Sequence, residues 1–200
     1  AQELALQLDD SVFFLGEDIG ESGGVFKCFK GMQEKWGERV RPTPIAEQAI
    51  IGAATGAALV GMRPVAEIMF CDFVGVCLDQ IVNHAAKQRY MSGGATHVPL
   101  TVRTIAGGGI GGFGAQHSQS TEALLLHTPG LKIVYPSTPT EAKGLLLRTP
   151  SVWRVLIQED MAAYRGRTCP QRPCPDDGTA RTVLSRTLGD GETATAAADR

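Results

Sequence analysis

Residues 43–74 read TPIAEQAIIGAATGAALVGMRPVAEIMFCDFV, and this stretch decides the fold. Its first half, residues 46–61, is rich in Ala, Ile and Leu and predicts an α-helix, with Thr43 and Pro44 as helix-start signals. Glycines inside that half lower helix propensity but permit another segment to pack closely. Residues 64–70, PVAEIMF, form a short apolar run that predicts a buried strand. A helix followed directly by a buried strand is the repeating unit of an α/β sheet.

The same alternation continues on both sides of this unit. Further strands are predicted at residues 12–15, 100–106, 131–135 and 155–158, and further helices at residues 78–91 and 139–147 and from near Ser120. Strands that alternate with helices favour a mostly parallel sheet covered by helices on both faces. We therefore predict the α/β fold class.

Composition excludes several classes of function. The 200 residues carry a formal net charge of -2, which gives no general attraction for nucleic acid or for an anionic membrane. No apolar run approaches the roughly 20 residues that span a bilayer, and the start, AQELALQLDD, lacks the features of a signal peptide. Five cysteines lie at irregular spacing without a CxxC pair, so we expect reduced thiols and no structural zinc.

The sequence changes character near residue 166. Residues 169–175 read CPQRPCP, and their three prolines break regular structure. We predict one domain over residues 1–165, and over residues 166–200 a tail or linker toward a further domain that is absent. Residues 189–191, GDG, resemble the start of a diphosphate- and magnesium-binding motif, but no Asn completes that motif in residues 192–200. A surface turn is therefore favoured for these three residues.

Residues 107–112, GGGIGG, satisfy the GxGxxG pattern after a predicted strand. A dinucleotide site needs a helix that opens at once and an acidic residue after a second strand, and neither follows here. We favour a flexible loop that presents the polar segment 116–120, QHSQS. His117 beside Ser118 makes no catalytic triad by itself, and a loop histidine on its own is more often structural or solvated than catalytic.

Glu47 is the acid in the first turn of the helix predicted at residues 46–61. Acidic side chains favour helix N-termini because they complement the positive end of the helix dipole. The position of Glu47, taken alone, therefore has an ordinary structural explanation.

Four ordered blocks, taken together, resemble one family. They are GEDIG with GGVF at residues 16–26, the stretch 43–74, DQIVNHAAKQRYMSGG at 79–94, and GAQHSQSTEALLLHTPGLKIVYPSTPTEAKGLL at 114–146. The sequence is similar to the β subunit of the E1 component of 2-oxo acid dehydrogenases of the pyruvate, acetoin and branched-chain types, within the transketolase superfamily. The resemblance covers residues 14–164 and implies a parallel α/β domain that binds the aminopyrimidine of thiamine diphosphate.

The resemblance also implies roles for residues around that pyrimidine. Glu47 matches the glutamate that hydrogen-bonds N1′ and promotes the reactive tautomer of the cofactor. Ile45 matches an apolar residue of the pocket, and Phe73 matches an aromatic residue that packs on the pyrimidine ring. Met69 falls where some members carry a polar residue, at the same pocket.

Two further residues are implied to lie at the site. His117 matches the histidine that faces the substrate, and an imidazole suits proton transfer near neutral pH. Glu17 belongs to the GED block near the cofactor. The family also differs from this chain in places: Arg41-Pro42 stands where relatives usually carry an acidic residue, and residues 147–154 read as shortened and basic, so we predict no monovalent-cation site.

The implied protein works with partners. An α subunit would hold the diphosphate and Mg²⁺ in an α2β2 heterotetramer, with no metal ligand from this chain, and a lipoyl-bearing E2 acyltransferase would receive the acyl group. The expected location is the cytoplasm in bacteria or the mitochondrial matrix in eukaryotes. The predicted activity is oxidative decarboxylation of a 2-oxo acid, with pyruvate favoured. Acetoin and branched-chain substrates remain open, as does a truncated, non-catalytic scaffold chain, while a fragment of a single-chain transketolase or deoxyxylulose-phosphate synthase is disfavoured.

Overall fold

One parallel sheet organises the protein. The structure is a computed structural model that describes residues 1–106, 113–148 and 155–160, and within them six strands pair in the order β2-β1-β3-β4-β6-β5. Every pairing is parallel. The strands are β1 (Val12–Glu17), β2 (Val40–Thr43), β3 (Arg63–Ile68), β4 (Thr101–Ala106), β5 (Lys132–Val134) and β6 (Val155–Asp160). The predicted strands at 12–15, 64–70, 100–106, 131–135 and 155–158 are all confirmed.

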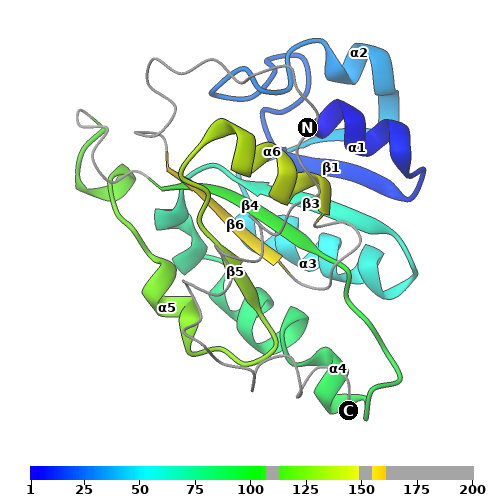
Figure 1. The fold of residues 1–200 in the computed structure, drawn as a ribbon, viewed down its shortest axis with the longest axis vertical. Coiled ribbons are helices and arrows are strands. Elements are labelled where there is room, and N and C mark those ends of the chain that lie inside the picture. Colours follow the sequence, from blue (N-terminus) through cyan, green and yellow to red (C-terminus); the bar gives the residue numbers. More distant parts are fainter. Residues whose placement is uncertain (107–112, 149–154, 161–200) are drawn as a thin grey trace.

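Helices cover both faces of this sheet (Figure 1). They are α1 (Gln2–Leu8), α2 (Met32–Trp36), α3 (Glu47–Leu59), α4 (Gln88–Met91), α5 (Glu122–Leu126) and α6 (Pro139–Arg148), with 3₁₀ turns η1 (Gly37–Arg39), η2 (Cys71–Gly75) and η4 (Ala115–His117) and a π-helix η3 (Gln80–Ala85). The predicted α/β fold class is confirmed.

The sheet has an apolar core on each face because successive strand residues point to opposite sides. On one face, Phe13 and Ile68 pack with Ile51 of α3 and Ile81 of η3. On the other face, Phe14 packs in a cluster with residues of α1 and α6, namely Leu6, Leu145 and Leu146. None of the helices in the described ranges is long and apolar enough to cross a membrane.

Strand β2 is not among the strands predicted from hydrophobicity, because Arg41 and Pro42 interrupt its apolar pattern. It lies at an edge of the sheet, where proline is tolerated, and pairs with β1 so that Pro42 lies opposite Gly16. Thr43, taken as a helix-start signal, is instead the last residue of β2, and α3 begins at Glu47 after Ala46. The role expected for Thr43 was therefore wrong, whereas the helix predicted at residues 46–61 is confirmed and starts within one residue of the predicted position.

The single helix predicted at residues 78–91 is also wrong in detail. The structure divides it into the π-helix η3 and the short α4. The Ala86 N–H donates to the Ile81 carbonyl at 2.9 Å, a bond that spans one residue more than in an α-helix. An apolar spacing read over so few residues does not separate these two helix types. The predicted loop at 107–112, the shortened segment at 147–154 apart from its first two residues, and the tail at 166–200 lie outside the described residues.

A buried ion pair crosses the middle of the sheet. Arg103 on β4 lies in register with Glu67 on β3, and its guanidinium contacts the Glu67 carboxylate. The two side chains are 5% and 11% exposed. Buried charges of this kind need their partner, because each alone would be strongly disfavoured in the apolar interior.

Candidate functional site

The candidate residues gather at the edge where the parallel strands end. Glu17 is the last residue of β1 and lies opposite Thr43, the last residue of β2. Glu47 follows β2 after a short turn, and Phe73 follows β3 on η2. In open α/β sheets the carboxyl ends of the strands are where ligands bind, because the loops there project from one edge. His117 also follows a strand of this sheet, β4, on the short turn η4.

The Glu17 carboxylate at this edge lies near other negative charges. Burial raises the pKa of Glu17, and the negative charges of Asp18 and then Glu47 raise it further. Asp18 has a left-handed backbone with φ of 55°, which aspartate tolerates better than most residues and which turns the chain directly after Glu17. Glu17, Asp18 and Glu47 thus form an acidic patch, and the like charges disfavour the ionised form of Glu17.

The negative charge of Glu47 also affects the thiol of Cys77. Burial raises the pKa of Cys77 to about 12, and the Glu47 charge contributes to that shift. The Glu47 carboxylate is half-buried, and among the described residues it makes no hydrogen bond or ion pair. A half-buried carboxylate with unused acceptor capacity at a ligand-binding edge is suited to receive a hydrogen bond from a bound molecule.

An aromatic cluster lies at the same edge of the sheet. The His117 ring is 5.2 Å from the Phe73 ring and 5.1 Å from the Phe70 ring, edge-on to both. Phe70 and Phe73 contact one another at 6.3 Å, and Phe26 and Phe113 flank Phe70. These centroid separations suit edge-to-face aromatic pairs. The cluster offers an apolar surface with one imidazole that can carry a proton.

Local turns place the two central rings. The Phe73 N–H donates to the Phe70 carbonyl at 3.0 Å, which closes η2 directly after β3. The His117 N–H donates to the Gly114 carbonyl at 3.2 Å. Gly114 has φ of 79°, a conformation that favours glycine, so this turn depends on it.

The remaining predicted residues lie at the same edge with less contact. Ile45 is 75% exposed in the turn between β2 and α3. Met69 follows β3 directly and is half-buried. Neither belongs to the two apolar cores, so both side chains are available to a ligand or a neighbouring chain.

Phe70, which contacts both Phe73 and His117, was missed in the sequence. Its signal was the repeated aromatic residue three positions before Phe73, at the end of an apolar run that was explained by the strand alone. The contacts of Asp72 were missed as well, because Gln119, its hydrogen-bond partner, lies far along the chain and no local spacing connects the two.

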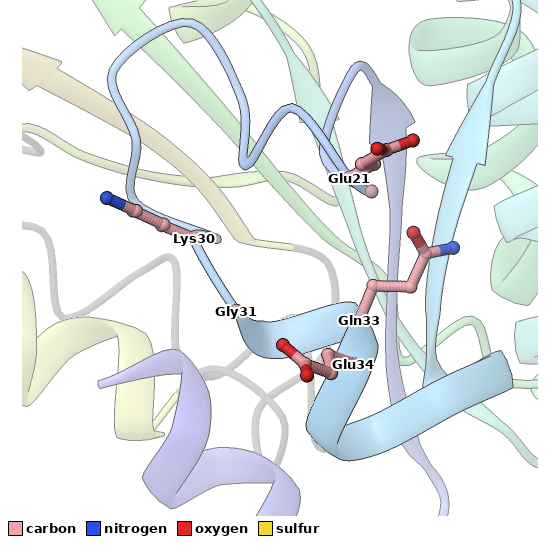
Figure 2. Close-up of a pocket in the computed structure, with 6 residues that line it drawn as sticks. Glu21, Lys30, Gly31, Gln33 and Glu34 are labelled. Carbon is pink, nitrogen blue, oxygen red and sulfur yellow. The ribbon is translucent and has the colours of Figure 1, made fainter.

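A separate hollow lies between the loop after β1 and helix α2, with a volume of about 500 Å³. It is lined by Gly20, Glu21, Lys30, Gly31, Gln33 and Glu34. Figure 2 shows the Lys30 and Glu21 side chains pointing away from one another, so the charged groups do not converge on a common ligand position. Its lining contains none of the candidate residues, and we assign the site to the Glu47 edge.

The acidic and sulfur-bearing residues do not gather into a metal centre within the described part of the chain. No group of three or more His, Cys, Asp or Glu side chains there could hold a metal ion.

Comparison with known protein families gives one match over most of the chain. Residues 1–153 match the family described as transketolase, pyrimidine binding domain. The structure is also similar to a solved one titled split gene transketolase, inactive beta4 tetramer, with a TM-score of 0.62 and 19% sequence identity over 78% of this chain and 46% of that one. At that identity, the likeness shows the fold alone.

Curated relatives are more similar in sequence. The β subunit of 2-oxoisovalerate dehydrogenase from Bacillus subtilis is 51% identical over 82% of this chain and 51% of its own length. The β subunit of acetoin:2,6-dichlorophenolindophenol oxidoreductase from Cupriavidus necator is 51% identical over 70% of this chain and 44% of its own length. The pyruvate dehydrogenase E1 component β subunit from Acholeplasma laidlawii is 47% identical over 74% and 45%. The chain spans about half the length of these relatives.

Proposed function

The chain belongs to the transketolase pyrimidine-binding domain family, and from that premise we propose that it supplies the pyrimidine half of a thiamine diphosphate site in a 2-oxo acid dehydrogenase E1 β subunit. The observation that carries the proposal is Glu47, a half-buried carboxylate without a hydrogen bond among the described residues, at the edge that also holds Phe73 and His117. Three relatives named as β subunits of such enzymes or of an acetoin oxidoreductase support it.

The residues present fit the aminopyrimidine chemically. Glu47 offers an acceptor for the N1′ position, and Phe73 offers an aromatic surface for a flat ring. Ile45 and Met69 add apolar side chains at the same edge. When bound, thiamine diphosphate supplies the nucleophilic carbon and the electron sink that decarboxylation of a 2-oxo acid requires.

Glu47 is assigned the proton at N1′. It is the first residue of α3, a position at which acidic side chains are favoured. The raised pKa of Glu17 lets that neighbour hold a proton more readily, which reduces the repulsion between the two carboxylates.

His117 is assigned to proton transfer at the substrate. Its imidazole is half-buried, and its edge contacts with Phe70 and Phe73 hold the ring at the margin of the apolar surface. Such a group can deliver or remove a proton while the phenyl rings keep water from the reacting carbon.

The diphosphate and Mg²⁺ are assigned to an α subunit in an α2β2 heterotetramer, and the acyl group to the lipoyl-bearing E2 acyltransferase. An exposed face of small residues on α3 supports contact with another chain. Ala49, Gly52, Ala53 and Gly56 are exposed there, and a Cβ placed on Gly52 or Gly56 would meet no atom within 4 Å. Helices with such faces can approach a partner backbone closely.

Substrate and location follow the relatives. We propose pyruvate as the substrate. The alternatives are 2-oxoisovalerate and acetoin, because the relatives named for them share 51% identity with the chain. A further relative, the β subunit of 2-oxoisovalerate dehydrogenase from Dictyostelium discoideum, is 51% identical over 72% of this chain and is named mitochondrial. We propose the mitochondrial matrix for a eukaryotic source and the cytoplasm for a bacterial one.

The proposal is tested on the full-length chain assembled with its α partner, thiamine diphosphate and Mg²⁺. Glu47→Ala is expected to slow exchange of the cofactor C2 proton by about 10²- to 10⁴-fold, the usual contribution of a positioned acid or base. Glu34→Gln changes an exposed acid at the start of α2 and serves as the control. Exchange at the wild-type rate in Glu47→Ala would refute the assignment. Turnover of a panel of pyruvate, 2-oxoisovalerate and acetoin identifies the substrate, and assembly without any turnover identifies a scaffold.

A further inference from the structure

A set of hydrogen bonds joins the two turns that carry Phe73 and His117. Asp72 Oδ1 accepts from the Gln119 backbone N–H at 3.3 Å and from the Gln119 side-chain amide at 2.7 Å. Beside it, the Cys71 thiol donates to the Gln119 carbonyl at 3.0 Å. The Thr121 hydroxyl donates to the Cys71 carbonyl, also at 3.0 Å. We call these four residues the latch.

The two sides of the latch differ in burial. Cys71 and Val74, on the η2 side, are fully buried, so Asp72 projects from a packed turn. On the other side Gln119 and Ser120 are exposed, and Gln119 meets this turn through the latch bonds. The contacts therefore fix the outer segment to the packed turn.

We infer that Asp72 is a positioning residue: its carboxylate holds the segment that carries His117 against the turn that carries Phe73. Asp72 directly precedes Phe73, and Gln119 lies two residues after His117. Their two hydrogen bonds act on the same short stretches as the edge contact between the His117 and Phe73 rings. This inference rests on the proposed function, in which His117 serves the substrate.

A carboxylate suits this task because a single oxygen receives two donors from one residue. Bonds to an ionised acceptor are shorter and stronger than bonds between neutral groups. The backbone donor fixes the path of the chain, and the side-chain donor fixes the rotamer of Gln119. An alanine at position 72 removes this acceptor and leaves both donors to water.

Four variants test whether the hydrogen bonds between Asp72 and Gln119 position His117. Asp72→Ala removes the acceptor, whereas Asp72→Asn keeps an amide oxygen for the backbone donor. Gln119→Glu places a second carboxylate against Asp72 and opposes the latch. In the double variant Asp72→Asn with Gln119→Glu, the Asn amide can donate to the new carboxylate, so the latch is restored with its polarity reversed.

The experiment uses the full-length chain assembled with its α partner and cofactor. Asp72→Ala and Gln119→Glu are expected to lower kcat about 10- to 100-fold, the effect of displacing a reacting group by about 1 Å. Asp72→Asn is expected to keep a kcat close to that of the wild type. The double variant is expected to recover most of the kcat lost in Gln119→Glu. Exchange of the cofactor C2 proton, which depends on Glu47, is expected to stay at the wild-type rate in all four.

A second measurement follows His117 without turnover. In the assembled complex, the rate of carbethoxylation of His117 by diethyl pyrocarbonate is measured by mass spectrometry. This rate is expected to be several-fold higher in Asp72→Ala and Gln119→Glu than in the wild type, and to fall back to the wild-type rate in the double variant. Asp79→Ala is the matched control, because it breaks a side-chain bond of similar length, 2.7 Å to Asn83, outside the latch.

The outcomes distinguish this inference from the proposed function. Wild-type kcat and wild-type labelling of His117 in Asp72→Ala overturn the latch. If Asp72→Ala does not fold, failure of the double variant to recover the loss seen in Gln119→Glu overturns it instead. Normal C2 exchange in Glu47→Ala refutes the proposed function, whereas slow exchange there with silent latch variants refutes the latch alone.

Discussion

The imidazole of His117 lies edge-on to the ring of Phe73, with 5.2 Å between the ring centroids and 89° between the planes. The two residues belong to loops that follow different strands, β4 and β3. Their contact is therefore produced by the sheet, which brings the loops to one edge, and by the bonds between those loops. A substitution of either ring should therefore change the packing of the other.

Phe73→Leu is expected to lower the free energy of unfolding by about 1–2 kcal/mol, because each aromatic pair contributes roughly 0.5–1.5 kcal/mol beyond its buried area. Phe73 pairs with Phe70 and with His117. Urea unfolding measures the effect. Phe26→Leu, which loses its one aromatic pair with Phe70, is the control and should cost less. A larger loss in Phe26→Leu would contradict the ring geometry.

Arg103→Met is expected to destabilise the protein by about 3–5 kcal/mol, because it leaves the buried Glu67 carboxylate without its ion-pair partner. Replacing both residues, with Glu67→Leu and Arg103→Met together, should recover much of that loss, since no lone charge is then buried. The measurement is the urea midpoint of the single and double variants. A double variant that is as unstable as Arg103→Met would argue against a simple charge-pair account.

The pKa of Glu17 is raised in the folded protein, first by burial and then by the charges of Asp18 and Glu47. A folded-state pKa above the unfolded value means that the folded protein binds more protons between the two values, so stability falls as the pH rises through that window. Glu17→Gln removes this penalty. We expect the variant to be more stable than the wild type at neutral pH, and the difference to vanish as the pH falls below the ordinary glutamate range. Urea unfolding at a series of pH values tests this, and an advantage that grew on acidification would contradict it.

Cysteine alkylation should separate the described thiols. Burial raises the pKa of Cys77 to about 12, whereas Cys28 is exposed. The thiolate fraction of Cys77 at pH 8 is then on the order of 10⁻⁴, and the thiolate is the reactive form. Iodoacetamide is expected to modify Cys28 and to spare Cys77 in the native protein, with both modified in urea. Mass spectrometry reads the sites, and equal native rates would refute the buried position of Cys77.

Glycines at two places should respond in opposite directions. A Cβ on Gly52 would meet no atom within 4 Å, so Gly52→Ala is expected to stabilise the chain by about 0.5–1 kcal/mol through helix propensity. A Cβ on Gly20 would lie 2.9 Å from Pro42 Cγ, so Gly20→Ala is expected to destabilise it. Thermal unfolding of both variants checks the pair. Destabilisation by Gly52→Ala in the unassembled chain would show that the exposed face of α3 is covered within the monomer.

Most of the sheet could be predicted from the sequence, because buried parallel strands have short apolar sequences, such as residues 64–70. Strand β2 could not, since Arg41 and Pro42 belong to an edge, where pairing rather than burial defines the strand. Helices α1 and α2 are short, and such helices are stabilised by tertiary packing, here through Leu6 and Met32, more than by local propensity.

The candidate site shows the same division. The structure places Glu17, Glu47, Phe73 and His117 at the carboxyl ends of the strands or in the segments that follow them. Their roles stay predictions until the variants are measured. Contacts that depend on distant loops, such as Asp72 with Gln119, leave no spacing in the sequence and become visible only when the loops are placed.

The edge position of β2 has a consequence for the chain during its synthesis. An open sheet edge is a template on which another unfinished chain can add a strand. Pro42 lacks a backbone N–H, and Arg41 adds a charge whose guanidinium lies over the Phe13 ring and bonds the Glu38 carbonyl. Both features hinder strand addition at this edge. The residues that hid β2 from a hydrophobicity pattern thus also protect the nascent sheet against aggregation.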